Sequence, residues 1–135
     1  LTNPQIPSEE RCNLRISLMQ EELNEIKEAI KNNDLVEIAD GFGDLMVVLC
    51  GSILEFGLGD KFNTLFDEVH RSNMSKACDS QQEAIETLLH YKQKDGTEGF
   101  YKEVDGKWLV YRTADNKVLK SINYSPANLS DIINE

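Results

Sequence analysis

Carboxylates at helical spacing stand in the most apolar stretch of this chain. Glu37, Asp40 and Asp44 are the only charged residues between positions 35 and 54, and intervals of three and four residues place them on one face of a helix. Desolvated carboxylates repel one another and are costly to bury without a cation. We therefore expect a positive ion between them, and a hard ion such as Mg²⁺, with Mn²⁺ as a substitute, prefers oxygen ligands of this kind.

A second acidic cluster, at Glu21, Glu22 and Glu25, lies one predicted helix earlier. The turn at residues 32–34 lets the two helices fold back antiparallel, which would bring the two clusters together. A solvated helix face explains the earlier cluster when it is taken alone, but that explanation fits the apolar second helix poorly. The two clusters together predict a metal site with the ligands Glu22, Glu25, Glu37 and Asp40, and with Asp44 beside them.

A third polar segment, residues 68–76, reads E-V-H-R-S-N-M-S-K. Arg71, Asn73 and Lys76 stand at the end of a predicted helix, where they could reach a phosphate or the edge of a base. A lysine would act there as a point charge. Taken alone, the segment is better explained as a helix C-terminus that carries favourable cations.

Apolar periodicity and capping signals predict a mostly helical chain. Ser8 and Asp34 are suited to cap the first two helices, and Asp105-Gly106 is typical of a tight hairpin turn. We expect helices at 9–31, 35–56, 61–76 and 129–134, a further helix that Asp79-Ser80 caps and that runs to about 92, and strands at 100–104, 108–113 and 117–122. The expected fold is an all-α antiparallel helical bundle with a small C-terminal β-hairpin. It forms a single domain over residues 1–135, with the hairpin inserted at about 96–122.

The composition of the second predicted helix indicates that other parts of the protein pack closely against it. Gly41, Gly43 and Gly51 lie in its interior, where each costs about 0.5–1 kcal/mol, so another backbone or a ligand is expected to approach closely. The helix is also apolar nearly all round and needs more cover than its short neighbours give. We therefore expect a homo-oligomer, either a dimer or a tetramer.

The composition of the chain limits its possible partners and its cellular location. A net charge of −10 over 135 residues argues against a nucleic-acid polymer as partner, although a bound metal lets an acidic pocket accept a nucleotide. Cys12, Cys50 and Cys78 are odd in number and widely spaced, which favours a reducing cytoplasm. No run is suited to span a membrane or to act as a signal peptide. The chain begins at Leu1 without a methionine, so a leading piece is expected to be missing or removed.

The three segments together resemble the MazG-like, all-α nucleoside triphosphate pyrophosphohydrolases, a superfamily that also holds the dimeric dUTPases and phosphoribosyl-ATP pyrophosphohydrolase. The resemblance rests on Glu21-Glu22-x-x-Glu25, on Glu37-x-x-Asp40, on residues 40–44 and on S-N-M-S-K at 72–76, and it resumes at 117–121 and 124–126. The interval between Glu25 and Glu37 is at the short end of the family pattern. Residues 79–116 look like an insertion to which that pattern assigns no role.

The resemblance implies cleavage of a nucleoside triphosphate between its α- and β-phosphates, which gives a nucleoside monophosphate and pyrophosphate. It implies Mg²⁺ at the four predicted ligands, with Asp44 as a further ligand or a close neighbour, and Glu21 as the group that orients or deprotonates water. Arg71, Asn73 and Lys76 would bind the substrate. Two alternatives stay open, namely hydrolysis of phosphoribosyl-ATP and a non-catalytic helical interaction module whose acids bind metal structurally.

Overall fold

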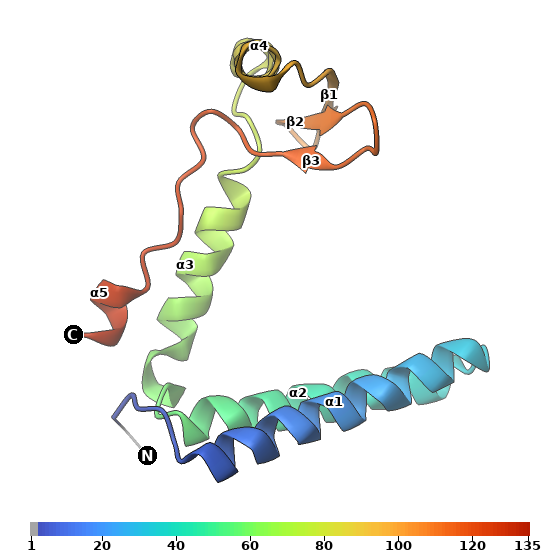
Figure 1. Cartoon of the computed structure of the whole chain (residues 1–135), viewed down its shortest axis with the longest axis vertical. Coiled ribbons are helices and arrows are strands. Elements are labelled where there is room, and N and C mark those ends of the chain that lie inside the picture. The colour runs from blue at the N-terminus through green and yellow to red at the C-terminus, as the bar shows by residue number, and fades with distance from the viewer. Residues whose placement is uncertain (1–2) are drawn as a thin grey trace. The chain divides into compact units, whose positions relative to one another are not determined.

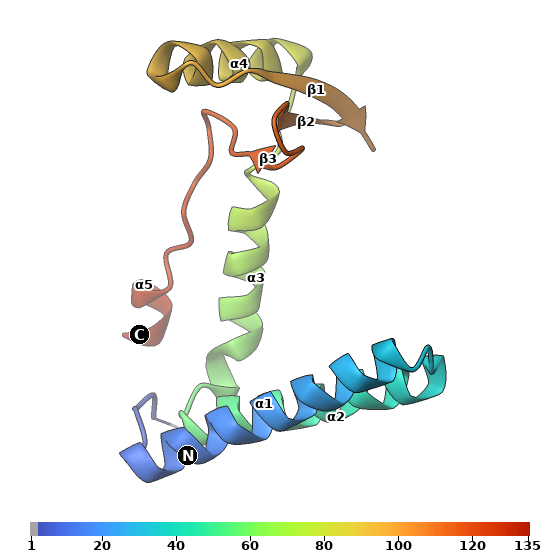
Figure 2. The ribbon, with the colours of Figure 1, turned by 45° about the vertical axis from the view of Figure 1, so that its right-hand side comes forward.

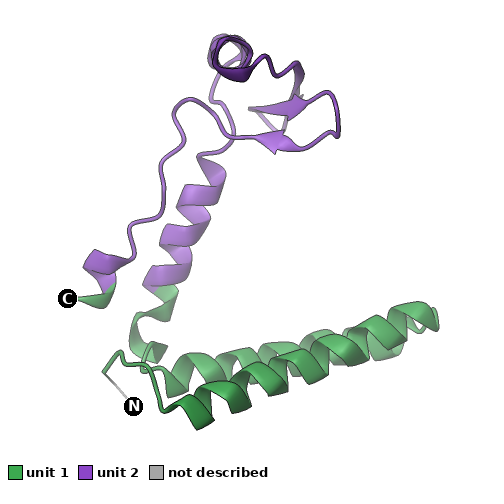
Figure 3. Cartoon of the chain, in the orientation of Figure 1, with its two compact units in different colours: residues 1–63, 133–135 green, residues 64–132 purple. Residues whose placement is uncertain are grey.

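The computed structural model describes residues 3–135, which form five α-helices, one short 3₁₀-helix and a three-stranded antiparallel sheet (Figure 1). The chain divides into two compact units, residues 1–63 with 133–135 and residues 64–132, and each is described by itself (Figure 3). The predicted class, mostly helical with a small hairpin near the C-terminus, is confirmed.

The first unit is built on an antiparallel pair of helices, α1 (Glu9–Lys31) and α2 (Leu35–Glu55), which lie side by side in Figures 1 and 2. Ser8 caps α1, because its hydroxyl oxygen accepts the backbone N–H of Arg11 at 3.3 Å. Asp34 caps α2 by accepting the N–H of Glu37 at 3.1 Å. The short turn between the helices therefore fixes how residues on one helix face those on the other.

Two of the three glycines of α2 allow α1 to approach. A Cβ atom at Gly41 would lie 2.7 Å from Cγ1 of Ile26, and one at Gly51 would lie 2.9 Å from Nη1 of Arg15. Both distances are too short for an unchanged neighbour. Cγ1 of the buried Ile26 lies next to its own backbone, so Gly41 favours glycine, whereas the guanidinium end of Arg15 can move aside at Gly51. Gly43 faces no atom within 4 Å, and its place in the helix has no such explanation among the described residues.

Glu55, at the end of α2, joins the two helices through charge. Its carboxylate accepts Nε–H of Arg11 at 2.5 Å and Nε–H of Arg15 at 2.5 Å, and its side chain is only 12% exposed. The hydrogen bonds from Arg11, and next those from Arg15, lower the pKa of Glu55 to about 2. This ion pair holds the far end of the helical pair, away from the acidic clusters.

The first unit closes around the end of α2. Gly57 adopts φ +72°, and it lies so close to the carbonyl group of Asn3 that a side chain would not fit. The backbone N–H of Gln5 donates to the carbonyl oxygen of Phe56 at 2.9 Å. A 3₁₀-helix, η1 (Gly59–Lys61), then leads into α3 (Phe62–Met74). The predicted helix at 61–76 is therefore two residues shorter at its C-terminus.

The second unit packs α4 (Gln81–Asp95) against one face of the sheet, as Figure 2 also shows. The strands β1 (Gly99–Val104), β2 (Lys107–Arg112) and β3 (Val118–Leu119) run antiparallel in sequence order. The core consists of Cys78, Ala84 and Val110, all at most 1% exposed, with partly buried cover from Leu88, Tyr101, Trp108 and Leu119. Alternation along β1 and β2 explains which residues face this core.

The third strand is shorter than predicted, because the chain leaves the sheet after two paired residues. Only Val118 and Leu119 pair with β2, and the polypeptide then bends so that Tyr91 donates its hydroxyl hydrogen to the carbonyl oxygen of Lys120 at 2.7 Å. The N–H of Ile122 donates to the hydroxyl of the buried Thr87 at 3.2 Å. From there the chain reaches the last helix, α5 (Ser130–Ile133).

No single helix in residues 3–135 has the length and apolar character needed to cross a membrane. The bent pair formed by Leu35–Glu55 and Gly59–Met74 passes that test together, by length and composition alone.

Candidate metal centre

Three carboxylates from the two long helices meet at one place in the first unit. Glu22 and Glu25 come from successive turns of α1, and Asp44 comes from the facing side of α2. Each offers a carboxylate oxygen, and these oxygens all lie within 4.8 Å of one another. Glu22 is half-buried, whereas Glu25 and Asp44 are exposed. The cluster is therefore partly desolvated at Glu22 and open to solvent at Glu25 and Asp44.

Glu22 has the least favourable environment of the three carboxylates. Its Oε2 atom is buried and has no hydrogen-bond partner among the described residues. Burial, and next the negative charge of Glu25, raise the pKa of Glu22, and Asp44 and Glu21 act in the same direction. A buried acceptor without a donor is unfavourable in the folded state, and a cation would relieve both its desolvation and the repulsion.

The donor set fits a hard divalent cation. All three side chains offer carboxylate oxygens, which Mg²⁺ and Mn²⁺ prefer, and Mg²⁺ commonly keeps some of its positions for water and phosphate oxygens. The exposed side of the cluster leaves room for such ligands. Within residues 3–135 it is the only place where three potential metal-ligating side chains come this close together.

Three of the predicted residues lie outside this group. Glu37 and Asp40 are exposed on α2, two turns and one turn before Asp44, and Glu21 is exposed on α1 next to Glu22. The structure thus brings together the carboxylates of Glu22, Glu25 and Asp44, and it does not bring Glu37 or Asp40 into the same cluster. Glu37 and Asp40 stay predicted ligands, and Glu21 stays the predicted base.

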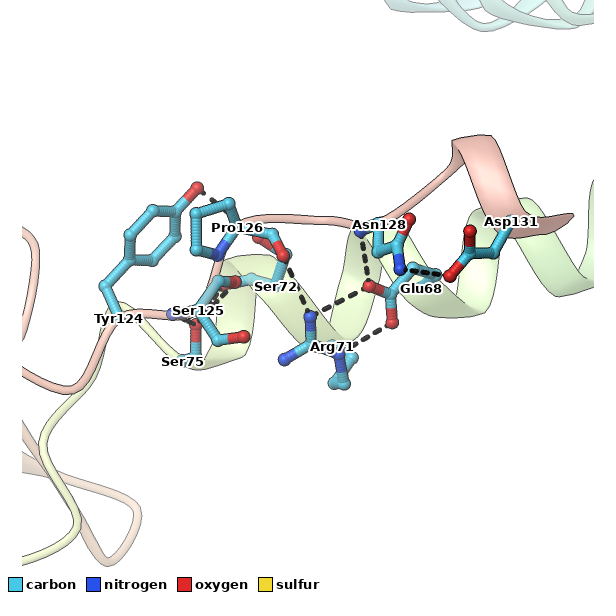
Figure 4. A network of polar contacts seen from close by, with 9 residues as sticks. All are labelled: Glu68, Arg71, Ser72, Ser75, Tyr124, Ser125, Pro126, Asn128 and Asp131. Carbon is cyan, nitrogen blue, oxygen red and sulfur yellow. Dashed lines mark hydrogen bonds and ion pairs between the residues drawn. The ribbon is translucent and has the colours of Figure 1, made fainter. Parts of the chain in front are cut away.

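Arg71 lies in the second unit and is engaged by its own surroundings (Figure 4). Its Nε and Nη2 atoms donate to the two carboxylate oxygens of Glu68 at 2.7 and 2.8 Å, and Nη2 also donates to the carbonyl oxygen of Pro126 at 3.2 Å. Glu68 in turn accepts the N–H of Asn128 at 2.7 Å. A role in binding substrate would require Arg71 to share or leave these contacts.

The same network fastens residues 124–128 along α3 (Figure 4). Ser75 Oγ accepts the N–H of Ser125 at 2.9 Å, and Ser72 lies 3.4 Å from the hydroxyl of Tyr124. Hydrogen bonds from Arg71, and next from the backbone of Asn128, lower the pKa of Glu68 to about 2. The predicted substrate segment is therefore also a docking surface for the chain's own C-terminal part, which its sequence alone did not indicate.

Asn73 and Lys76 have a different environment from Arg71. Both line a groove of about 370 Å³, together with residues of β1, β2 and β3. Among the described residues, neither the side-chain amide of Asn73 nor the ammonium group of Lys76 has a hydrogen-bond or ion-pair partner. The motifs did not indicate the strand residues that line this groove. The alternation of apolar residues along the predicted strands could have indicated a second apolar face of the sheet.

Comparisons with known proteins point to one family. The family model for phosphoribosyl-ATP pyrophosphohydrolase matches residues 1–73, just over half of the chain. An uncharacterized protein of Acanthamoeba polyphaga mimivirus is 41% identical over 81 residues, which cover 56% of this chain and 32% of that protein. The chain therefore matches about a third of the length of this relative. The matched family region contains both acidic clusters and ends at Asn73.

Proposed function

The chain belongs to the phosphoribosyl-ATP pyrophosphohydrolase family, within the MazG-like all-α superfamily, and on this premise we propose that it is a Mg²⁺-dependent nucleoside triphosphate pyrophosphohydrolase. It cleaves the substrate between the α- and β-phosphates and releases a nucleoside monophosphate and pyrophosphate. The observation that carries the proposal is the cluster of Glu22, Glu25 and Asp44, in which one buried carboxylate oxygen has no donor among the described residues.

Mg²⁺, when bound, would supply positive charge that offsets the negative charge developing on the phosphates during the reaction. Glu22, Glu25 and Asp44 are the first ligands in this proposal, because their oxygens already lie together. Asp40 and Glu37 follow along the same helix, where they would complete the set or hold water molecules. The exposed side of the cluster is the side from which the triphosphate enters.

Glu21 is the proposed base of the reaction. It is exposed on α1 directly before Glu22, so it can reach water at the edge of the cluster. It accepts a proton as the water oxygen bonds to the α-phosphorus, and the bond from that phosphorus to the bridging oxygen of the β-phosphate breaks. Pyrophosphate leaves as one piece. Asn73 and Lys76 bind the phosphate chain, with Arg71 as a further contact once it leaves Glu68.

Phosphoribosyl-ATP is a second candidate substrate, and the description of the matching family favours it. The bond broken is the same, and the two substrates differ in the ribosyl phosphate attached to the base. A third possibility is an interaction module in which the acids bind metal without turnover. It predicts metal-dependent stability with no consumption of nucleotide.

We also propose that the active form is a homodimer or homotetramer. Seven large apolar residues of α2 are exposed, and they include Phe42 at 58%, Met46 at 66% and Val47 at 71%. A patch of this extent on a helix calls for cover by another surface. A second copy of the same helical pair would supply that cover in a symmetric bundle.

The test is a substrate panel with product identification. The protein is incubated with Mg²⁺ and, separately, each of the eight common ribo- and deoxyribonucleoside triphosphates and phosphoribosyl-ATP, in water enriched in ¹⁸O. We expect pyrophosphate and a labelled nucleoside monophosphate. Labelled orthophosphate with a nucleoside diphosphate would show a different reaction, and an absence of turnover on every substrate would favour the interaction module.

A further inference from the structure

One face of the hairpin sheet is not used by the core. In the antiparallel register, Phe100 pairs with Tyr111 and Lys102 pairs with Leu109, so these residues share the face opposite to Tyr101 and Val110. Tyr101 and Val110 belong to the core, which faces α4. The opposite face is therefore directed away from α4 and carries a mixture of apolar, aromatic and cationic side chains.

The two ends of this face differ. At one end the rings of Phe100 and Tyr111 stack on each other with centroids 5.3 Å apart, and the ammonium group of Lys102 lies 5.7 Å from one ring centre and 5.9 Å from the other. These groups already satisfy one another. Towards the other end Val104 and Leu109, together with Val118 of β3 beside Tyr111, help to line the groove of about 370 Å³ that continues to the end of α3. This end is the open one.

The groove combines apolar walls with polar groups that lack partners. Val104, Leu109, Val118 and Met74 supply apolar surface. The amide of Asn73 and the ammonium group of Lys76 make no hydrogen bond or ion pair within residues 3–135, although the backbone of Lys76 accepts the N–H of Ser121. The other charged residues that line the groove are Asp105 and Lys107, and the ammonium group of Lys107 forms an ion pair with Asp79 at 2.5 Å. A concave site with apolar walls and a few convergent polar groups is typical of a small-molecule site.

We propose that this groove of the second unit binds the nucleoside part of a nucleotide, with the hairpin insertion in contact with the base. The base lies against Leu109 and Val118, and Lys76 with Asn73 faces the phosphate that follows the sugar. Asp105 accepts a hydrogen bond from a sugar hydroxyl or a base N–H group. This inference rests on the proposed function for the identity of the ligand, but apart from Asn73 the residues that it uses lie beyond the region that the family model matches.

Charge and size favour a nucleotide over other occupants. The chain carries a net charge of −10, so an unpaired ammonium group beside an apolar wall is a local exception that suits a phosphate attached to an apolar ring. A volume of about 370 Å³ lies in the range of small-molecule pockets, about 300–1,000 Å³. The groove lined by Pro4, Ile6, Phe56, Leu58 and Ile133 has no charged lining residue, and nothing in the described structure indicates what covers it.

The experiment compares two variants and two classes of probe. Val118→Trp fills the groove from an exposed edge strand, where the residue is 42% exposed and tolerates a larger side chain. Leu89→Trp is the control, because Leu89 is 53% exposed on α4 in the same unit and does not line this groove. The probes are the α,β-methylene analogues of ATP, GTP, CTP and UTP, which are not cleaved at the bond in question, and inorganic tripolyphosphate, which has no base.

We expect Val118→Trp to weaken binding of the best nucleotide analogue by about tenfold or more, since it removes the space for the base. Binding of tripolyphosphate should stay within about twofold of the unmodified protein, because the substitution removes no charged or metal-ligating group. Leu89→Trp should change neither affinity. Equal affinities for the analogue in both variants, or an equal loss for the analogue and tripolyphosphate, would overturn the inference.

A measurement on the unmodified protein covers the case in which Val118→Trp fails to fold. In ¹⁵N-resolved NMR spectra, the amides of Leu109 and Val118 should shift on titration with the analogue and stay unchanged with tripolyphosphate. Shifts only elsewhere would overturn the inference. Turnover without these shifts would support the proposed function and overturn this inference. The shifts without turnover would support this inference and overturn the proposed function. An absence of analogue binding at millimolar concentration would overturn both.

Discussion

The two units of this chain bury their apolar residues to different extents. In the second unit, Cys78, Ala84 and Val110 are at most 1% exposed and the sheet has α4 as cover. In the first unit, the apolar helix α2 leaves Met46 and Val47 at 66% and 71% exposure. The unit that carries the acidic cluster is thus the one whose surface is incomplete by itself. The unit that holds the hairpin has a core of its own.

The largest expected effect of this difference is on catalysis. Asp44→Asn or Glu25→Gln keeps the side-chain shape and removes a negative ligand, so either should lower kcat/KM by about 100-fold or more. Asp79→Asn in the second unit, which removes an exposed partner of Lys107, is the matched control and should change kcat/KM by less than about twofold. The measurement is steady-state release of pyrophosphate with the best substrate. Full Mg²⁺-dependent activity in both Asp44→Asn and Glu25→Gln would exclude this metal site.

Asp40→Asn and Glu37→Gln sharpen the same result. If only the three clustered carboxylates hold the metal, these two variants should lose less activity than Asp44→Asn and should keep the same apparent affinity for Mg²⁺. A loss of Mg²⁺ affinity equal to that of Asp44→Asn would instead place them among the ligands. A Mg²⁺ titration of activity separates the two results.

The second effect concerns assembly. Val47→Glu places a charge in the exposed apolar surface of α2 and should convert the proposed oligomer into a monomer, because burying an unpaired charge is costly. Leu89→Glu makes a matched change at a residue that is 53% exposed in the second unit, and we expect it to leave the assembly unchanged. Light scattering at micromolar protein concentration with Mg²⁺ measures the mass of each. A monomeric unmodified protein would remove the proposal of an oligomer.

The sequence predicted the helical pair well, because its signals are local. Caps at Ser8 and Asp34, together with a three-residue turn, fix where α1 and α2 begin and how they fold back. The acids were also identified by helical spacing. Their spacing alone did not tell that Asp44, rather than Asp40, lies closest to Glu22 and Glu25, because that depends on the rotation of one helix against the other.

Long-range contacts account for what the sequence did not indicate. Arg71 was predicted to bind substrate, but its partners include Pro126, which lies 55 residues further along the chain. Directly after β3, the carbonyl oxygen of Lys120 accepts a hydrogen bond from Tyr91, which lies 29 residues earlier in the chain. The groove beside Asn73 depends on the register of β1 with β2. None of these contacts leaves a periodic pattern in the residues that make it.

A smaller effect is expected on the stability of the metal-free protein. Glu22→Gln removes a carboxylate whose pKa is raised by burial and by Glu25, so it should increase the melting temperature without metal by a few degrees, about 2–4 °C. Mg²⁺ should then stabilise the variant less than the unmodified protein. Differential scanning calorimetry with a chelator and with Mg²⁺ measures both. A lower melting temperature for the variant under chelation would contradict the repulsion on which the metal site is argued.

The raised pKa of Glu22 also predicts how the stability of the metal-free protein depends on pH. Because the pKa of Glu22 is higher in the folded state than in the unfolded state, the folded state binds more protons between those two values. The penalty from Glu22 is therefore present above the raised pKa, decreases as the pH falls below it, and is lost below the usual value near 4.5. In Glu22→Gln this part of the pH dependence should be absent, which a series of melting temperatures between pH 7 and pH 4.5 would measure.

The smallest effect distinguishes the two units in acid. Glu55 in the first unit and Glu68 in the second have pKa values of about 2, lowered by hydrogen bonds from Arg11 and Arg71 respectively. Both values are depressed below the usual value near 4.5. The stability that each pair adds is therefore present above that usual value and is lost as the pH falls towards about 2. Below this range neither carboxylate contributes.

Trp108 is the only tryptophan of the chain and packs against the core of the second unit, so its fluorescence reports that unit, whereas far-ultraviolet circular dichroism is dominated by the helices of both. Glu68→Gln should move the acid transition seen by fluorescence to higher pH, since it also weakens the bond from the N–H of Asn128. Glu55→Gln should move the transition seen by circular dichroism and leave the fluorescence transition in place. Shifts that coincide for both probes in both variants would show that the two units unfold as one, and the contrast between them would then describe packing and not independent stability.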